Sequence, residues 1–435
     1  MKASQLNYRP PHPHNLDYVV ANGLCTGCGI CESMAGRQHI EMRYTGAAQL
    51  RPQVKSEPDE AVMDNIMVVC PGAVLAGPKV ILAEESAAPH DPVWGPISTI
   101  HRSWSGDPEI RHWAAAGGTL TALGVHLLQS GEVEAILHVK ASATDPIHTE
   151  SQVSRTRAEV IAAAQSRYGP GAALARVEEL LAAGTIFAVI AKPCDIAAIR
   201  HLQQVDARAK AQIKYCLTIF CGGVPSTIFP EVLADYNGIK RDELSVFRWR
   251  GNGWPGPTHM EAKDGRSADM TYDQLYYTPN VPWVYDMQFR CKICPDAIGT
   301  VADIAAPDGW VMRDGKPIHE EADGVNIAVA RNAKGAALLQ SAAKAGALVL
   351  DDFSVEELYA MHGDHLDRRL GAPARLLGMR FANAPIPRVI GFELGAMLRQ
   401  AARRFGWRAT LRDLWAAFTG ARRRAKAGAH REPLA

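Results

Sequence analysis

The middle of the chain alternates amphipathic segments with short apolar runs. Apolar residues recur at helical spacing over residues 120–128, and Gly131 closes this segment. Residues 134–141 (EAILHVKA) then have the pattern of a strand. The order repeats, with a predicted helix over residues 169–184 and a predicted buried strand over residues 185–194 (TIFAVIAKPC). This alternation predicts an α/β core with a largely parallel sheet.

Residues 213–221 (IKYCLTIFC) have the pattern of another buried strand, and residues 347–353 (ALVLDDF) are predicted to form a late strand. Residues 240–320 are rich in Gly, Pro and Trp, and are predicted to be irregular. Residues 84–96 are rich in Pro and Ala with turn residues, which is typical of a linker.

The C-terminal pattern differs, because residues 399–424 carry many arginines with large apolar residues between them. These apolar residues are Phe405, Trp407, Leu411, Leu414, Trp415 and Phe418. The pattern predicts a basic amphipathic helix. Two interpretations stay open: contact with anionic lipid or an acidic partner, or a terminal helix packed on the protein and followed by a solvated tail.

Composition agrees with a soluble globular protein of two or three domains. The 435 residues are 47% apolar and 21% charged. Lys and Arg number 47 against 46 Asp and Glu, so net charge indicates no nucleic-acid partner. Because no signal-peptide h-region and no apolar run of roughly 18 residues are recognisable, we expect a cytoplasmic protein. Its nine cysteines are then more useful for metal or redox chemistry than for disulfides.

Cys25, Cys28 and Cys31 have the C-x2-C-x2-C spacing of a bacterial ferredoxin, but no Cys-Pro follows at positions 35 and 36. In two-cluster ferredoxins this run occurs twice, and the fourth cysteine of each run binds the other run's cluster. The next cysteine here is Cys70, followed by Pro71. A second run that ended there would need cysteines at positions 60, 63 and 66, where the chain has Glu, Met and Ile.

All four ligands of one cluster are therefore absent, and all four of the other are present. We predict that Cys25, Cys28, Cys31 and Cys70 hold one 4Fe–4S cluster in a ferredoxin-like module. The alternatives are a four-cysteine zinc site, although zinc usually prefers paired C-x2-C knuckles, and an abandoned motif.

A second set of four cysteines comes from three separate segments. Cys194 and Cys221 each stand just past an apolar strand, at the edge where open α/β sheets bind ligands. Cys291 and Cys294 form a C-x2-C pair. The four could bind one cluster, or could be unrelated buried thiols with a zinc knuckle. Cys216 lies inside its predicted strand and is interpreted as a core residue.

With these cysteines in view, the chain resembles the beta subunit family of coenzyme F-420 hydrogenase and formate dehydrogenase. That family includes 7-hydroxymethyl chlorophyll a reductase and ferredoxin-dependent divinyl chlorophyllide reductase. The resemblance covers six ordered blocks from about residue 110 to residue 335: EIRHWAAAGGTLTALGVHLLQSGEVEAILHV, QSRYGPGAALARVEELL, AKPCDIAAIR, FCGGVPS, WRGNGWPG and RCKICPDAIGTVADIAAPDGW.

The resemblance implies FAD and a 4Fe–4S cluster at Cys194, Cys221, Cys291 and Cys294. Several family members also add an N-terminal ferredoxin-like module. KPCD around Cys194 departs from the commoner T-P-C-Q, and the chlorophyll-reducing branch has different cysteine surroundings. The substrate is therefore not carried over.

Several residues are candidates for the flavin site. Gly117 and Gly118 open a helix whose N–H groups favour a pyrophosphate. Arg167 could pair with a phosphate or be an ordinary surface arginine. Lys192 could lie near the flavin N1 and C2 oxygen or form a plain salt bridge. The predicted contacts are Gly117, Gly118, Thr119, Ser166, Arg167, Tyr168, Lys192 and Trp254.

The stretch WRGNGWPG (residues 249–256) suits a loop stacked on a flat ring, and a structural turn is equally compatible with it. Asp296 and Asp303 could cap and orient the C-x2-C loop. No Ser–His–Asp or paired-carboxylate set is recognisable, so catalytic residues stay unknown.

The predicted fold is α/β (α+β overall), with a ferredoxin-like module before a flavin-binding core. The predicted parts are residues 1–85 (ferredoxin-like 4Fe–4S domain), 86–100 (linker), 101–240 (N-terminal part of the core), 241–380 (C-terminal part with the C-x2-C loop) and 381–435 (basic amphipathic tail).

The predicted function is that of an oxidoreductase with two 4Fe–4S clusters and FAD, exchanging electrons with a deazaflavin or similar conjugated ring. The alternatives are a tetrapyrrole or chlorophyll-derivative reductase, a non-enzymatic electron-transfer subunit, and a zinc-stabilised binding protein. The expected partners are a ferredoxin or another redox subunit, a membrane surface at the basic tail, and a second copy in a homo-oligomer.

Overall fold

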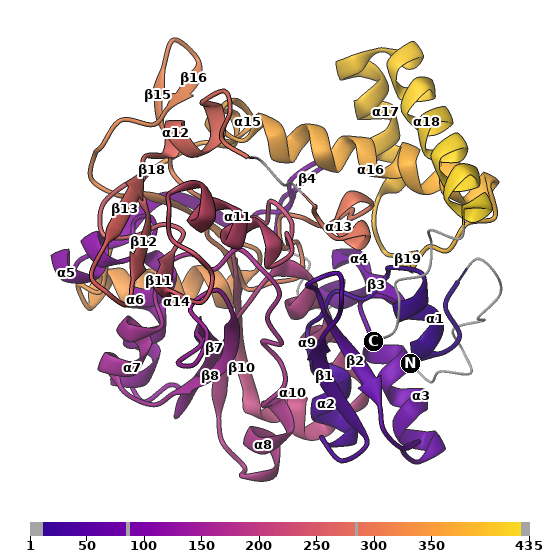
Figure 1. The fold of residues 1–435 in the computed structure, drawn as a ribbon, viewed down its shortest axis with the longest axis horizontal. Coiled ribbons are helices and arrows are strands. Elements are labelled where there is room, and N and C mark those ends of the chain that lie inside the picture. The colour runs from indigo at the N-terminus through magenta and orange to yellow at the C-terminus, as the bar shows by residue number, and fades with distance from the viewer. Residues whose placement is uncertain (1–11, 84–87, 283–285, 428–435) are drawn as a thin grey trace.

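The computed structural model describes residues 12–83, 88–282 and 286–427. An eight-stranded sheet lies at its centre, in the order β18-β6-β17-β14-β10-β9-β7-β8 (Figure 1). The predicted parallel arrangement is found from β14 to β7, whereas the strands on both flanks pair antiparallel. The strands are β6 (Thr99–Ser105), β7 (Ala135–Ala141), β8 (Thr149–Ser154), β9 (Phe187–Ile190), β10 (Ile213–Thr218), β14 (Ile304–Ala305), β17 (Asn326–Ala330) and β18 (Leu348–Asp352).

Helices cover both faces of this sheet. Leu137 and Val189 share a core with α8 and α9, whereas their neighbours Ile136 and Ala188 share a core with α6 and α14. Successive strand residues point to opposite faces, so burial on both faces explains why these strands are continuous apolar runs. The surrounding helices are α5 (Pro108–Trp113), α6 (Thr119–Gln129), α7 (Arg157–Ala162), α8 (Val177–Ala182), α9 (Pro193–Val205), α10 (Ala207–Gln212) and α14 (Ala333–Lys344).

The helix predicted over residues 169–184 is only partly formed, because α8 begins at Val177. The preceding stretch is held by contacts to other segments. The Leu174 N–H donates to the Cys28 carbonyl at 2.9 Å, and the Ser151 hydroxyl donates to the Ala173 carbonyl at 2.9 Å. These contacts override the local helix preference of an Ala-rich segment.

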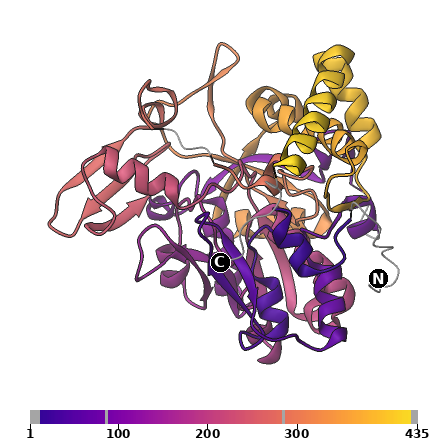
Figure 2. The same ribbon diagram turned by 45° about the vertical axis from the view of Figure 1, so that its right-hand side comes forward.

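The N-terminal module packs directly on the core and is also joined by the C-terminal part of the chain (Figures 1 and 2). Its helices α2 and α3 contact α8 and α9, and its last strand pairs parallel with β19 (Arg388–Ile390). The module comprises α1 (Leu16–Ala21), α2 (Ile30–Ala35), β1 (Ile40–Tyr44), β2 (Leu50–Val54), α3 (Glu60–Val69), β3 (Val74–Ala76) and α4 (Pro78–Ile81).

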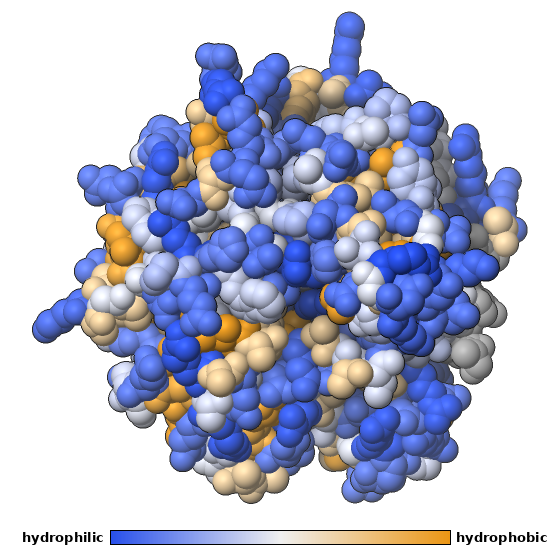
Figure 3. All heavy atoms as spheres, turned by 60° about the vertical axis from the view of Figure 1, so that its left-hand side comes forward, coloured by the Kyte–Doolittle hydropathy of each residue, from blue (hydrophilic) through white to orange (hydrophobic). Residues whose placement is uncertain are grey.

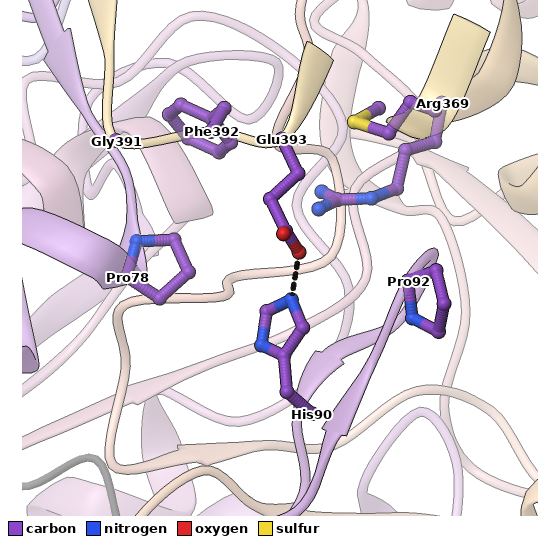
Figure 4. Close-up of a pocket in the computed structure, with 8 residues that line it drawn as sticks. Pro78, His90, Pro92, Arg369, Gly391, Phe392 and Glu393 are labelled. Carbon is purple, nitrogen blue, oxygen red and sulfur yellow. Dashed lines mark hydrogen bonds and ion pairs between the residues drawn. The ribbon is translucent and has the colours of Figure 1, made fainter. Parts of the chain in front are cut away.

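The described part of the expected linker, residues 88–100, is packed against the core. It contains β4 (His90–Asp91) and β5 (Gly95–Pro96), and Trp94 between them is completely buried. Glu393 bonds the His90 ring (Figure 4) and also Lys79 at 2.7 Å. This segment is therefore fixed to both the N-terminal module and the C-terminal helices.

The prediction of irregular structure over residues 240–320 is wrong in part, because several helices and strands lie within that stretch. An antiparallel sheet forms there and packs on Phe229, Leu233 and Trp249 in a core of its own. Gly and Pro between the strands hid their short alternating patterns. The elements are α11 (Ile228–Tyr236), β11 (Leu244–Arg248), β12 (Thr258–Ala262), β13 (Ser267–Met270), α12 (Tyr272–Tyr277), α13 (Phe289–Lys292), β15 (Val311–Arg313) and β16 (Lys316–Ile318).

The side of the molecule that carries α5, α7 and this small sheet is mainly hydrophilic. Figure 3 shows its apolar side chains in patches separated by hydrophilic ones. The apolar side chains of the small sheet therefore pack largely in its own core.

Four helices lie in the C-terminal part that the structure describes: α15 (Val355–Met361), α16 (Gly363–Phe381), α17 (Leu394–Phe405) and α18 (Trp407–Lys426). The predicted basic helix is two helices, because Gly406 between them has a φ of 83°, which is unfavourable for other residues. α18 packs on α16 and buries Thr410 and Ala421, as the packed interpretation expects. Among the described helices, none is both long enough and apolar enough to cross a membrane.

His138 on β7 supplies a pH-dependent contribution to stability. Its ring bonds the Ser154 hydroxyl at 2.8 Å, and burial lowers its pKa from 6.5 to about 4. Between these pH values the unfolded chain binds the proton and the folded chain does not, so the free energy of unfolding falls as the pH falls. When the pH falls from about 7 to about 5, we expect the free energy of unfolding of His138→Gln to decrease by about 2 kcal/mol less than that of the wild-type protein. Urea unfolding at both pH values measures this, and equal losses would contradict it.

Candidate cofactor site

The four cysteines of the first predicted set come together in the N-terminal module. Cys25, Cys28, Cys31 and Cys70 are all buried, and none of them forms a disulfide. Burial raises the pKa of Cys70 to about 11, with the charge of Cys25 adding to the effect. Burial and then the charges of Cys28, Cys25 and Cys70 raise the pKa of Cys31 well above its ordinary value. The four sulfurs are therefore near enough to act on one another.

Backbone N–H groups point at the sulfurs of this first set. The Gly27 N–H donates to Cys25 Sγ at 3.4 Å, and Ile30 N–H serves Cys28 in the same way. Gly29 reaches this turn with a φ of 82°, and a Cβ there would lie 2.8 Å from the Ala172 Cβ. The loop thus needs glycine both for its conformation and for its contact with the core.

The second predicted set also comes together, at the C-terminal edge of the parallel strands. Cys194 stands in the first turn of α9 after β9, and Cys221 follows β10. Burial, followed by the charge of Cys291, raises the pKa of Cys221 to about 12. The charge of Cys294 contributes there too. All four thiols are partly exposed, so this set is more accessible than the first.

Side chains beside Cys291 bridge the two sets. Gln288 Nε2 donates to Cys291 Sγ and to the Thr26 carbonyl, both at 3.5 Å. Arg290 Nη2 donates at 3.3 Å to the carbonyl of Pro71, the residue that follows the last cysteine of the first set. The two sets are therefore joined by direct polar contacts.

Asp195 forms another bridge between the sets. Its carboxylate accepts from Cys194 Sγ at 3.8 Å and from Lys192 Nζ at 2.7 Å. After burial, the charge of Asp195 is the largest cause of the raised pKa of Cys28, so this carboxylate also lies near the first set. Burial disfavours the charged form of Lys192. The charges of Asp195 and Cys194 outweigh this effect and raise the pKa of Lys192.

Arginines of α16 hold the loops that carry the second set. Arg368 donates to the Gly222 carbonyl and, at 3.4 Å, to the Cys291 carbonyl. The other contacts are from Arg369 to the Pro295 carbonyl at 2.8 Å and from Arg375 to the Lys292 carbonyl at 2.6 Å. A helix more than 70 residues downstream thus fixes the cysteine loops.

The donor set fits the predicted clusters. Four thiols with N–H groups aimed at their sulfurs have the donor chemistry that a 4Fe–4S cluster requires, and cluster binding by these cysteines stays a prediction. In the part of the chain that the structure describes, no three or more His, Cys, Asp or Glu side chains are arranged around a single metal ion. Cys216 lies outside both sets, completely buried in β10.

The predicted flavin residues at the start of α6 are engaged by the protein itself. A Cβ at Gly117 would lie 2.7 Å from the Ser103 carbonyl oxygen. The Thr119 N–H donates to Asn326 Oδ1 at 3.2 Å, and its hydroxyl bonds Ser103 Oγ at 2.7 Å. Gly118 is the left-handed residue before the helix. Close packing therefore accounts for these residues, and their contact with a phosphate stays a prediction.

Arg167 and Tyr168 also make internal contacts, on a loop that includes Ser166. The Arg167 guanidinium donates to three carbonyls, including that of Phe247 at 3.0 Å, and burial lowers its pKa to about 10. The Tyr168 hydroxyl accepts from Arg250 Nη1 at 3.2 Å. The structure thus places these residues between the core and the small antiparallel sheet.

Trp254 lies inside the protein, 2% exposed. Its ring contacts that of Trp310, with 4.7 Å between centroids, and the guanidinium of Arg250 lies 4.9 Å from its centroid. Arg250 also pairs with Asp308 at 2.7 Å. These contacts agree with a structural turn for residues 249–256, and a flavin contact of Trp254 stays a prediction.

Asp296 and Asp303 anchor the segment after the C-x2-C pair. Asp296 accepts from the Thr300 N–H at 3.0 Å. Asp303 is completely buried and accepts from Arg200 Nη2 at 2.8 Å and from the Cys216 N–H at 2.7 Å. Asp296 therefore caps the turn after the C-x2-C pair, whereas Asp303 joins α9 to β10, and a role of Asp303 in orienting the C-x2-C loop stays a prediction.

One apolar hollow lies away from the predicted flavin residues. It has a volume of about 430 Å³ between α16, β19 and the start of α17. Apolar residues such as Leu376, Ile386 and Leu394 line it, together with Arg380 and Arg388.

Comparison with known proteins identifies the core. The family model described as coenzyme F420 hydrogenase/dehydrogenase, beta subunit N-terminus, matches residues 100–178, and the C-terminal model matches residues 185–356. Together they cover more than half of the chain. The chain belongs to this beta subunit family. Within it, Cys194, Cys221 and the C-x2-C pair lie in the matched region, whereas the first cysteine set and the helices α16–α18 lie outside it.

Individual members of the beta subunit family are similar at low identity. The coenzyme F420 hydrogenase beta subunit of Methanosarcina barkeri is 22% identical over 51% of this chain and 75% of its own length. The corresponding subunit of Methanothermobacter thermautotrophicus is 23% identical over 61% and 88%. The F420-dependent formate dehydrogenase 1 beta subunit of Methanococcus maripaludis is 27% identical over 55% and 58%.

A solved structure agrees with the fold. A chain of the xenon-derivatised F420-reducing [NiFe] hydrogenase complex from Methanosarcina barkeri gives a TM-score of 0.53 at 18% identity, over 69% of this chain and 99% of its own. The family is one of oxidoreductase subunits, so the chain is an oxidoreductase-type protein with a role in electron transfer.

Proposed function

We propose that this beta subunit family member is an iron–sulfur flavoprotein oxidoreductase with two 4Fe–4S clusters and FAD. A flavin exchanges electron pairs with organic substrates, while iron–sulfur clusters carry single electrons. Such a protein would connect a two-electron substrate with a one-electron partner. The observation that supports the proposal is the set of polar contacts through Gln288, Arg290 and Asp195 that join the loops of the two four-cysteine sets.

The residues around the cysteines have distinct roles in this proposal. Cys25, Cys28, Cys31 and Cys70 would hold the enclosed cluster, and the partly exposed second set would hold the cluster next to FAD. Asp195 and Gln288 keep the two sets together. The positive charge of Lys192, balanced by Asp195, would favour a reduced, anionic group beside Cys194.

The names of the relatives support a deazaflavin, or a similar conjugated ring, as the organic substrate. They also support a redox partner, since one similar chain is part of a hydrogenase complex. The partner proposed here is a ferredoxin or another redox subunit. A tetrapyrrole or chlorophyll-derivative reductase of the same family remains the second candidate, based on the sequence resemblance.

Anaerobic purification followed by cofactor analysis tests the proposal. We expect about eight iron and eight sulfide atoms per chain, from two clusters of four iron atoms each, and one releasable FAD. About two zinc ions without sulfide would overturn it in favour of two structural zinc sites. Two clusters without flavin would instead favour a non-enzymatic electron-transfer subunit. Reduction of a deazaflavin, but not of tetrapyrroles, would decide between the two substrate classes.

A further inference from the structure

α18 presents large apolar side chains to solvent. Trp407, Leu411 and Trp415 are 58%, 58% and 61% exposed. Because they are spaced four residues apart, they lie on one side of the helix and form what we call the α18 ridge. Phe418 extends it by stacking on Trp415, with 5.2 Å between ring centroids.

Arginines border this ridge. Arg408 and Arg412 each follow a ridge residue, so they form a stripe beside it. Residues 399–427 contain eight arginines and one lysine against a single acidic residue, Asp413. Arg404 pairs with Asp367 at 2.7 Å, whereas Arg408 and Arg412 have no acidic partner among the residues that the structure describes.

The ridge stands on a preformed support at the edge of the molecule (Figures 1 and 2). The neighbouring side of α18, which buries Thr410 and Ala421, packs closely on α16, where a Cβ at Gly378 would lie 2.2 Å from the Leu414 carbonyl oxygen. The helix therefore exists before any partner binds. Little ordering entropy opposes docking of a surface that is already formed.

We propose that α18 docks this protein on an anionic lipid surface. The ridge would enter the boundary between headgroups and acyl chains, while the neighbouring arginines contact lipid phosphates. Tryptophan is favoured at that depth because its ring is apolar and its N–H is polar. This docking lies outside both family-matched regions and does not depend on the proposed cofactors.

Other occupants would match only one of the two features of this surface, the apolar ridge or the arginines beside it. Two copies of the chain would bring two strongly basic helices together, and their like charges repel. An acidic soluble protein would pair with the arginines without offering an apolar layer to the ridge. An anionic bilayer offers an apolar layer for the ridge and, at an adjacent depth, phosphates for the arginines.

Co-sedimentation of the full chain with lipid vesicles tests the docking. We expect binding to phosphatidylcholine vesicles containing about one-third phosphatidylglycerol, and binding at least tenfold weaker to phosphatidylcholine alone. The double change R408Q/R412Q should weaken binding to the anionic vesicles roughly thirtyfold, because each basic residue near the surface contributes independently to the free energy of binding. The double change W407S/W415S should weaken it by about tenfold or more.

Tyr277→Ser is the matched control, because Tyr277 on α12 is 66% exposed and far from α18 along the chain. It should bind vesicles like the wild type, and circular dichroism should be the same for all variants. Equal binding to neutral vesicles, or unchanged binding of W407S/W415S, would overturn the proposal. So would the capture of an acidic ferredoxin by Arg408 and Arg412 without any binding to vesicles.

Discussion

Replacing Cys70 with serine is expected to lower the iron content from about eight to about four atoms per chain, with an equal loss of sulfide. Cys70 is buried beside the charges of Cys25 and Cys31, and a hydroxyl is a much poorer iron ligand than a thiolate. The second set comes from other segments, so its cluster should survive. Iron and sulfide assays on anaerobically purified protein measure the change.

Cys216→Ala is the matched control for that experiment. Cys216 is buried like the cysteines of the first set but lies in β10, outside both sets, so its replacement should leave the full iron content. Iron content that is unchanged in Cys70→Ser would contradict the assignment of the first set. Complete loss of iron, with intact circular dichroism, would contradict the independence of the two sets.

Replacing Asp303 with alanine is expected to reduce the free energy of unfolding by about 3–5 kcal/mol. Burial alone would raise the pKa of Asp303, but Arg200, Lys334 and Asn332 together lower it, which shows how strongly its charge is stabilised. The substitution removes the carboxylate that pairs with Arg200 at 2.8 Å, although Arg200 itself is only 5% exposed. The change in urea midpoint relative to wild type measures the loss.

Asp352→Ala provides the comparison, because Asp352 is an exposed carboxylate at the end of β18. Its replacement should change the free energy of unfolding by less than about 0.5 kcal/mol. A loss below about 1 kcal/mol in Asp303→Ala would contradict the role given to this buried ion pair.

Both cysteine sets could be predicted because their determinants are short-range or topological. The spacing of Cys25, Cys28 and Cys31 defines one loop, and Cys70 follows from the ferredoxin repeat. Cys194 and Cys221 meet because parallel neighbouring strands end at the same edge of a sheet. That their sulfurs bind clusters stays a prediction.

The surroundings of the cysteines could be anticipated less well. Gln288 stands three residues before Cys291, so the sequence alone places its amide near that cysteine. Their contact could therefore have been anticipated. Asp195 was visible only as a local departure in KPCD. No sequence pattern links Arg368 to the Cys291 loop, since that contact depends on how α16 packs.

Hydrophobic periodicity fails in two opposite ways in this chain. It misses the small antiparallel sheet, and it predicts more helix before α8 than the structure forms. In β12, buried and half-exposed residues alternate over only five positions, too few to stand out between Gly and Pro. Around Leu174, a strong helical pattern yields to a bond with Cys28. Tertiary contacts decide both cases, and neither is encoded within one short window.

The bridges through Gln288, Arg290 and Asp195 have a consequence for how the protein works over time. Because each is made by buried or nearly buried groups, the N-terminal module cannot swing away from the core as a mobile shuttle arm without losing all of them. The separation of the two cysteine sets is then settled once, when the chain folds. Internal electron flow would have no diffusive step, and only the exchange with outside partners would depend on encounters.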